Sequence, residues 1–179
     1  MKRFGLALLV FLAFTISPTP AQEPAPGGSV VSGTPQWEKI KSLAGEWDGY
    51  MMEGSQKIPT HVSVRITGDG SAVMHWIDAG TPHEMITMFH MDKTDLLATH
   101  YCAAHNKPRL RAVPSTETRQ IAFEFKDGTN IRPGDGYMKQ LTITFVDVDH
   151  HNETWGYDNK GKVEAGVLYL TRVKQTQKQ

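Results

Sequence analysis

The chain has 179 residues, with 19 basic and 19 acidic side chains and a single cysteine. This even balance of charge, without a long basic block, argues against nucleic acid or an anionic membrane surface as a partner. One cysteine cannot form an internal disulfide, so the folded domain must be stabilised by its core alone.

Residues 1–21 have the pattern of a secretory signal peptide. Lys2 and Arg3 precede an apolar run, and the small residue Ala21 stands at a plausible cleavage site. The run is too short to span a bilayer comfortably, and no later segment is apolar enough to do so. The sequence therefore predicts an exported protein, periplasmic or extracellular, that does not insert into a membrane after cleavage.

A flexible leader and one folded domain are predicted to follow. Residues 22–35 are rich in Pro, Gly and Ser and lack the apolar periodicity of a packed segment. Residues 36–176 are long enough for one domain with a real core. A short helix opens this part of the chain, because Thr34 can cap it, Pro35 suits its first position and Gly45 ends it.

The rest of the chain alternates between apolar and polar residues with the period of β-strands. Val62, Val64 and Ile66 fall on one face of the first clear strand, and a turn sequence follows them. Nine or ten such segments follow one another with turns at roughly ten-residue spacing, which indicates a sandwich or a closed barrel. Long strands, short turns and a single helix favour a mainly β fold with one antiparallel up-and-down barrel of about 8–10 strands.

Two short motifs resemble those of lipocalin-type (calycin) barrels. The segment LAGEWDGY places Gly45 and Trp47 on the first strand behind the helix, and YLTRV places Arg172 on the last strand. In calycins a basic side chain from the last strand covers a tryptophan of the first. The resemblance implies that Arg172 covers Trp47, a cation–π contact worth about 0.5–2 kcal/mol.

The middle of the chain resembles an uncharacterised group of bacterial exported lipocalin-like proteins. The motifs that carry this resemblance are TPHEM, THYC and N-x-PR. The resemblance covers most of the chain after the signal peptide. It implies the same barrel and brings no activity with it.

A hairpin is expected around the only cysteine. If the strands pair about a turn at Lys93–Thr94, Thr87 lies opposite His100 and Met85 lies opposite Cys102. Since side chains two residues apart share a face of a strand, one face then collects several chemically useful groups. These are His83, Met85, His100 and Cys102.

Three interpretations of this face remain open. His83, His100 and Cys102 are competent zinc or copper ligands, although no CxxC or HExxH motif accompanies them. In the second interpretation Cys102 is a nucleophile with His100 as its base, but side chains at positions i and i+2 of a strand lie roughly 6–7 Å apart at their bases. In the third interpretation these side chains simply line the barrel wall. The mixed polarity of both faces favours a barrel with a partly polar ligand cavity.

The residues after the cysteine give further candidates. Asn106 precedes a turn or bulge, and Arg109 is placed near the barrel mouth, where it would pair with Glu84 or Asp78 or hold a ligand carboxylate or phosphate. His150 and His151, which stand among acidic residues, are interpreted as a solvated turn.

These features predict an exported binding module that holds a small, mostly apolar molecule inside a barrel. The predicted ligand-binding residues are His83, Met85, His100, Tyr101, Cys102, Asn106 and Arg109. One alternative is a haem- or metal-binding barrel, since nitrobindins are haem-binding barrels of calycin type, although their glycine-rich start has no match here. The other is a hydrolase or isomerase using His100, Cys102 or Glu84. No catalytic residue, cofactor or oligomeric state follows from the sequence.

Overall fold

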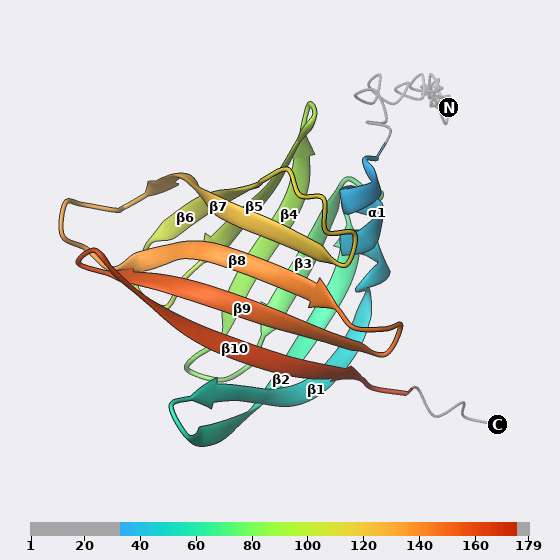
Figure 1. Cartoon of the computed structure of the whole chain (residues 1–179), viewed down its shortest axis with the longest axis horizontal. Coiled ribbons are helices and arrows are strands. Elements are labelled where there is room, and N and C mark those ends of the chain that lie inside the picture. Colours follow the sequence, from blue (N-terminus) through green and yellow to red (C-terminus); the bar gives the residue numbers. More distant parts are fainter. Residues whose placement is uncertain (1–32, 175–179) are drawn as a thin grey trace, which may run out of the picture.

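The structure is a computed structural model, and it describes residues 33–174. It is mainly β, with ten antiparallel strands in one closed barrel and one short helix before the first strand (Figure 1), which confirms the predicted fold class. The signal peptide predicted for residues 1–21 and most of the leader lie outside the described residues. No helix in the described part of the chain is long and apolar enough to cross a membrane.

The helix α1 (Pro35–Ser42) begins where the sequence predicts. The side chain of Thr34 accepts a hydrogen bond of 3.2 Å from the backbone N–H of Trp37. The helix buries Trp37 and Ile40 against the barrel. The strands that follow are β1 (Gly45–Glu53), β2 (Gln56–Thr67), β3 (Ala72–Ile77), β4 (Met85–Asp92), β5 (Asp95–Tyr101), β6 (Lys107–Ala112), β7 (Gln120–Thr129), β8 (Tyr137–Phe145), β9 (His150–Asn159) and β10 (Lys162–Arg172).

Each strand pairs with the next along the chain, and β1 pairs with β10 to close the barrel. The predicted pairing of β4 with β5 is confirmed, because Thr87 lies opposite His100 and the two strands meet at a turn of Lys93 and Thr94. The predicted pair of Met85 with Cys102 is not formed. Strand β5 ends at Tyr101, and the N–H of Cys102 donates instead to the carbonyl of Asn106 in a tight turn.

The barrel has two different ends. At the helix end, α1 packs against β4 and leads into the start of β1. The open end carries the β1–β2 and β9–β10 turns (Figure 1). Large apolar side chains fill the interior towards the helix end. They include Trp37, Ile40, Leu43, Trp47, Val62, Val64, Val73, Phe89, Leu96 and Leu110.

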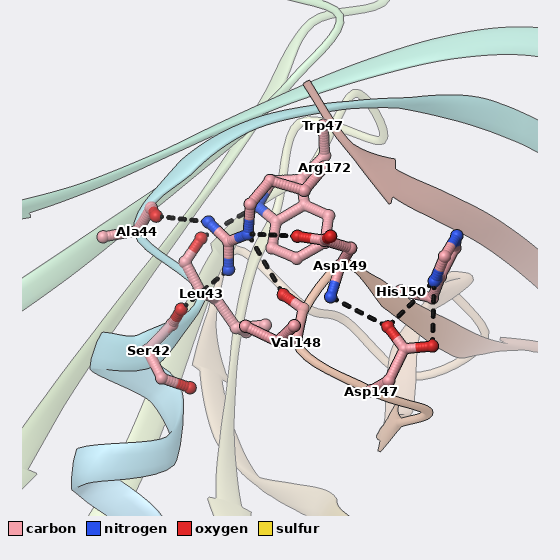
Figure 2. A network of polar contacts seen from close by, with 9 residues as sticks. All are labelled: Ser42, Leu43, Ala44, Trp47, Asp147, Val148, Asp149, His150 and Arg172. Carbon is pink, nitrogen blue, oxygen red and sulfur yellow. Dashed lines mark hydrogen bonds and ion pairs between the residues drawn. The ribbon is translucent and has the colours of Figure 1, made fainter. Parts of the chain in front are cut away.

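A single arginine fastens the helix end (Figure 2). The guanidinium carbon of Arg172 lies 4.1 Å from the ring centroid of Trp47, so the expected contact is present. Arg172 also donates to the carbonyls of Ser42, Ala44 and Val148, at 3.0, 2.7 and 3.1 Å. These bonds join the last strand to the end of α1 and to the turn between β8 and β9.

The start of β1 must be glycine for this closure to form. Gly45 has a φ of +139°, which L side chains rarely adopt, and a Cβ there would lie 2.7 Å from Nη1 of Arg172. The indole N–H of Trp47 donates to the carbonyl of Leu43 at 2.8 Å, which fixes the ring beneath the guanidinium. The LAGEW segment is therefore shaped to receive Arg172.

Candidate functional site

A layer of polar side chains crosses the barrel interior beyond the apolar core. Its members come from β3, β4, β5 and β9, and each is at most 1% exposed. They are His75, Thr87, His100, His151 and Glu153. Buried polar groups are costly unless they are hydrogen-bonded, so each contact in this layer is informative.

Glu153 is the centre of one half of this layer. Its Oε1 atom accepts from Nε2 of His75 at 2.8 Å and from Nε2 of His151 at 3.1 Å, and its Oε2 accepts from the indole N–H of Trp155 at 3.0 Å. Burial alone would raise the pKa of Glu153, but the charge of His75 and the hydrogen bonds of both histidines outweigh it and lower the pKa. Glu153 is therefore a buried carboxylate held in its ionised form.

His100 forms the other half of the layer with Thr87. Its Nδ1 atom lies 2.9 Å from the hydroxyl of Thr87, and its ring lies 4.9 Å from the ring of Trp155. Burial and the neighbouring His75 lower the pKa of His100 to about 4, so the imidazole is neutral at neutral pH. Its Nε2 atom is buried and has no hydrogen-bond partner among the described residues.

A cavity of about 440 Å³ lies between this layer and the open end. Apolar side chains make up most of its wall, and His100 and Trp155 lie at its inner end. The lining residues are Met51, Ile58, Thr60, Ile77, Asp78, His83, Met85, His100, Met138, Trp155 and Leu168. No lysine or arginine is among them.

The predicted site residues fall into separate places. His83, Met85 and His100 line the cavity, with His83 exposed on the turn before β4. Tyr101 is exposed on the outside of β5, and Cys102 is half-buried in the turn that follows. Burial raises the pKa of the Cys102 thiol, which disfavours the thiolate that a nucleophile needs.

Asn106 and Arg109 do not line the cavity. The amide of Asn106 is buried, and it donates to the carbonyl of Gly136 at 2.8 Å beside a separate polar pocket of about 280 Å³. Arg109 forms an exposed ion pair with Asp127 at 2.6 Å, so the expected partners Glu84 and Asp78 are wrong. The pairing of Arg109 with Asp127 could not be predicted from the sequence, because a bulge in the pairing of β6 with β7 shifts the register beside Arg109.

The predicted metal ligands are not brought together. Within residues 33–174, no group of three or more His, Cys, Asp or Glu side chains is placed to hold a metal ion. His83 lies on the turn before β4, His100 inside β5, and Cys102 beyond the end of that strand. The hairpin therefore does not gather the three side chains around one point.

Sequence reasoning missed His75, His151 and Glu153. His151 is buried on β9, so its assignment to a solvated turn is wrong; the turn consists of residues 146–149. The alternation of side chains along the strand could have identified His75 as buried, since it lies between the inward-facing Val73 and Ile77. A polar residue at an inward position of a barrel strand is a better site candidate than one next to a cysteine.

Comparisons with known proteins identify the fold. The sequence matches no family model and no curated protein. A protein of unknown function from the DUF3598 family of Nostoc punctiforme PCC 73102 aligns with a TM-score of 0.52 and 13% identity, over 75% of this chain and 49% of that one, so this chain spans about half of its length. Rv2717c from M. tuberculosis aligns with a TM-score of 0.53 and 14% identity, over 79% of this chain and 99% of that one. At these identities the likeness concerns the fold alone.

Proposed function

We propose that this protein is an exported, lipocalin-like binding protein that holds a small, mostly apolar molecule in the cavity at the open end of its barrel. The observation that carries the proposal is an apolar cavity of about 440 Å³ with one buried, unpartnered imidazole nitrogen at its inner end. Ligand sites are typically concave and apolar, with a few polar groups that fix orientation. Export rests on the signal pattern of residues 1–21.

The size and wall of the cavity support a small ligand. At roughly 30 Å³ per atom, the share that one water has in the liquid, the cavity has room for about 15 non-hydrogen atoms. Three methionines contribute to the wall: Met51, Met85 and Met138. Because a thioether side chain is unbranched and flexible, these residues can adjust to ligands of different shape.

A haem-binding barrel is the second candidate, and one observation favours it. A buried, neutral histidine with one free nitrogen, such as His100, is a common axial ligand of haem iron. The volume of the cavity favours the smaller ligand, because a porphyrin is larger than the space available. Titration with haemin separates the two, since haem coordination gives a Soret band that His100→Leu removes.

The binding proposal is tested with the neutral dye N-phenylnaphthylamine, whose fluorescence rises in apolar sites. The full-length protein is expected to bind the dye, and Met85→Trp, which fills the cavity, is expected to abolish binding. Met88→Trp is the matched control, because Met88 lies on the same strand but outside the set of cavity-lining residues. Equal binding by both variants, or no binding by the native protein, would contradict the proposal.

A further inference from the structure

The polar end of the ligand can be inferred from His100, and this step rests on the proposed function. His100 lies opposite Thr87 in the pairing of β4 with β5, and both side chains are buried. The only hydrogen bond of either side chain within residues 33–174 is the one between them, at 2.9 Å. The placement of one proton therefore decides what the cavity offers to a ligand.

The hydroxyl of Thr87 determines where that proton lies. If Nδ1–H of His100 donated to the hydroxyl oxygen, two buried groups would lack a partner: the hydroxyl proton and the Nε2 lone pair. If the hydroxyl donates to Nδ1, the donor left without a partner is Nε2–H, and His100, unlike Thr87, lines the cavity, where a ligand can accept from it. Because a buried donor without an acceptor costs free energy, the arrangement that places the free donor at the cavity is favoured.

The neutral imidazole therefore directs an N–H group toward the inner end of the cavity. Since burial and His75 lower its pKa to about 4, His100 offers this proton without a positive charge at neutral pH. A ligand atom that meets it must be a hydrogen-bond acceptor.

The charges around the cavity exclude a carboxylate as the preferred acceptor. The lining contains no lysine or arginine, and its one acidic residue is Asp78. Behind the wall, the ionised Glu153 accepts a hydrogen bond from Trp155, which itself lines the cavity. Glu153 is itself paired with His75 at 2.8 Å, so desolvation decides: an anion placed at His100 would lose its hydration with no lysine or arginine of the cavity wall to pair with it.

We infer that the ligand is a neutral molecule with one oxygen acceptor, such as a ketone, ester or ether, on an otherwise apolar body, and that Nε2–H of His100 binds this oxygen. His100 then acts as a specificity-determining residue. It distinguishes neutral acceptor-bearing molecules from fatty acids of the same length.

Displacement of N-phenylnaphthylamine tests this inference with two probes of matched length, methyl decyl ketone and dodecanoate. Near pH 8, where an ordinary histidine is neutral, the ketone is expected to bind at least about tenfold more tightly than dodecanoate. His100→Leu is expected to weaken ketone binding about tenfold more than it weakens dye binding, which is measured for each variant as the reference. His100→Gln, which keeps an N–H donor, is expected to restore part of the loss.

A measurement on the native protein guards against misfolded variants. Long-range proton–nitrogen NMR correlation is expected to show His100 with its proton on Nε2, and this signal is expected to shift when the ketone binds. A proton on Nδ1, or dodecanoate binding as tightly as the ketone, would overturn the inference while dye binding still supports the cavity. Failure of the dye and of both probes to bind would instead reject the proposed function itself.

Discussion

An arginine lies at each end of the barrel, and the two make very different contacts. At the helix end, Arg172 covers Trp47 and donates to three backbone carbonyls. At the open end, Arg109 forms one exposed ion pair with Asp127. Exposed ion pairs contribute little to stability, whereas Arg172 adds a cation–π contact with the buried Trp47 ring and a hydrogen bond to the part-buried carbonyl of Ala44. The helix end is held shut by these contacts, and the open end carries the cavity that we propose to be the binding site.

The polar layer divides these two regions, and replacing its centre should have the largest effect. Glu153→Ala removes the acceptor of three buried donors, on His75, His151 and Trp155. We expect the free energy of unfolding to fall by about 3–5 kcal/mol, measured by urea denaturation. Glu153→Gln retains an acceptor and should cost less. An equal loss in both variants would mean that volume, rather than hydrogen bonding, holds the layer.

Acid should weaken the same layer. The pKa of His100 is lowered from 6.5 to about 4, so the unfolded chain takes up a proton in this range before the folded protein does. Stability is therefore complete above about pH 6.5 and falls by about 3 kcal/mol on the way down to about pH 4. The lowered pKa of Glu153 acts in the same direction at still lower pH.

Urea denaturation at a series of pH values measures this dependence. His100→Gln is the control, because it removes the titrating group and should flatten the curve between pH 6.5 and 4. An unchanged slope in this variant would assign the pH dependence to other groups.

The two arginines should differ by their contacts. Arg172→Ala is expected to lower the free energy of unfolding by about 2–3 kcal/mol, because it removes the cover of Trp47 and the donor to the part-buried carbonyl of Ala44. Arg109→Ala should cost less than about 1 kcal/mol. Thermal unfolding of both variants measures the difference, and similar losses would remove the contrast between the two ends.

Packing gives the smallest and most local contrast. Ala98 is fully buried in the filled part of the barrel, so Ala98→Leu should overpack the core and cost about 1–3 kcal/mol. Ile58→Phe adds volume at the cavity wall and should change stability by less than about 1 kcal/mol. The same denaturation assay compares them. A larger loss for Ile58→Phe would show that the cavity cannot accept added atoms.

The barrel could be predicted from the sequence because the features that specify it, alternating side chains and short turns, lie close together in the chain. Alternation along each strand and the short turn at Lys93–Thr94 set the pairing of β4 with β5, and the structure has that register. The prediction failed where the strand stopped. The alternation of side chains along the strand predicted that it continues through Cys102. In the structure β5 ends at Tyr101, because the chain turns there and His105 adopts a φ of +60°.

The site was less accessible because its parts are distant in the chain. His75 and Glu153 are 78 positions apart and meet only after the barrel has closed. Their polar character also made them poor candidates for buried positions. A histidine among acidic residues, such as His151, is expected to be solvated unless the pairing of the strands shows that it faces inward. Only His100 was both predicted as a site residue and placed at the inner end of the cavity.

The pairing of β1 with β10 has a consequence for how the molecule is made. Most strands can pair with a partner that precedes them closely, but Trp47 waits for Arg172, which is synthesised 125 positions later. Until β10 has been synthesised, β1 and β9 are unpaired edge strands to which a strand of another chain can add. Biogenesis therefore has a vulnerable interval that ends only when the ring is complete, and a chain interrupted before β10 would be prone to self-association.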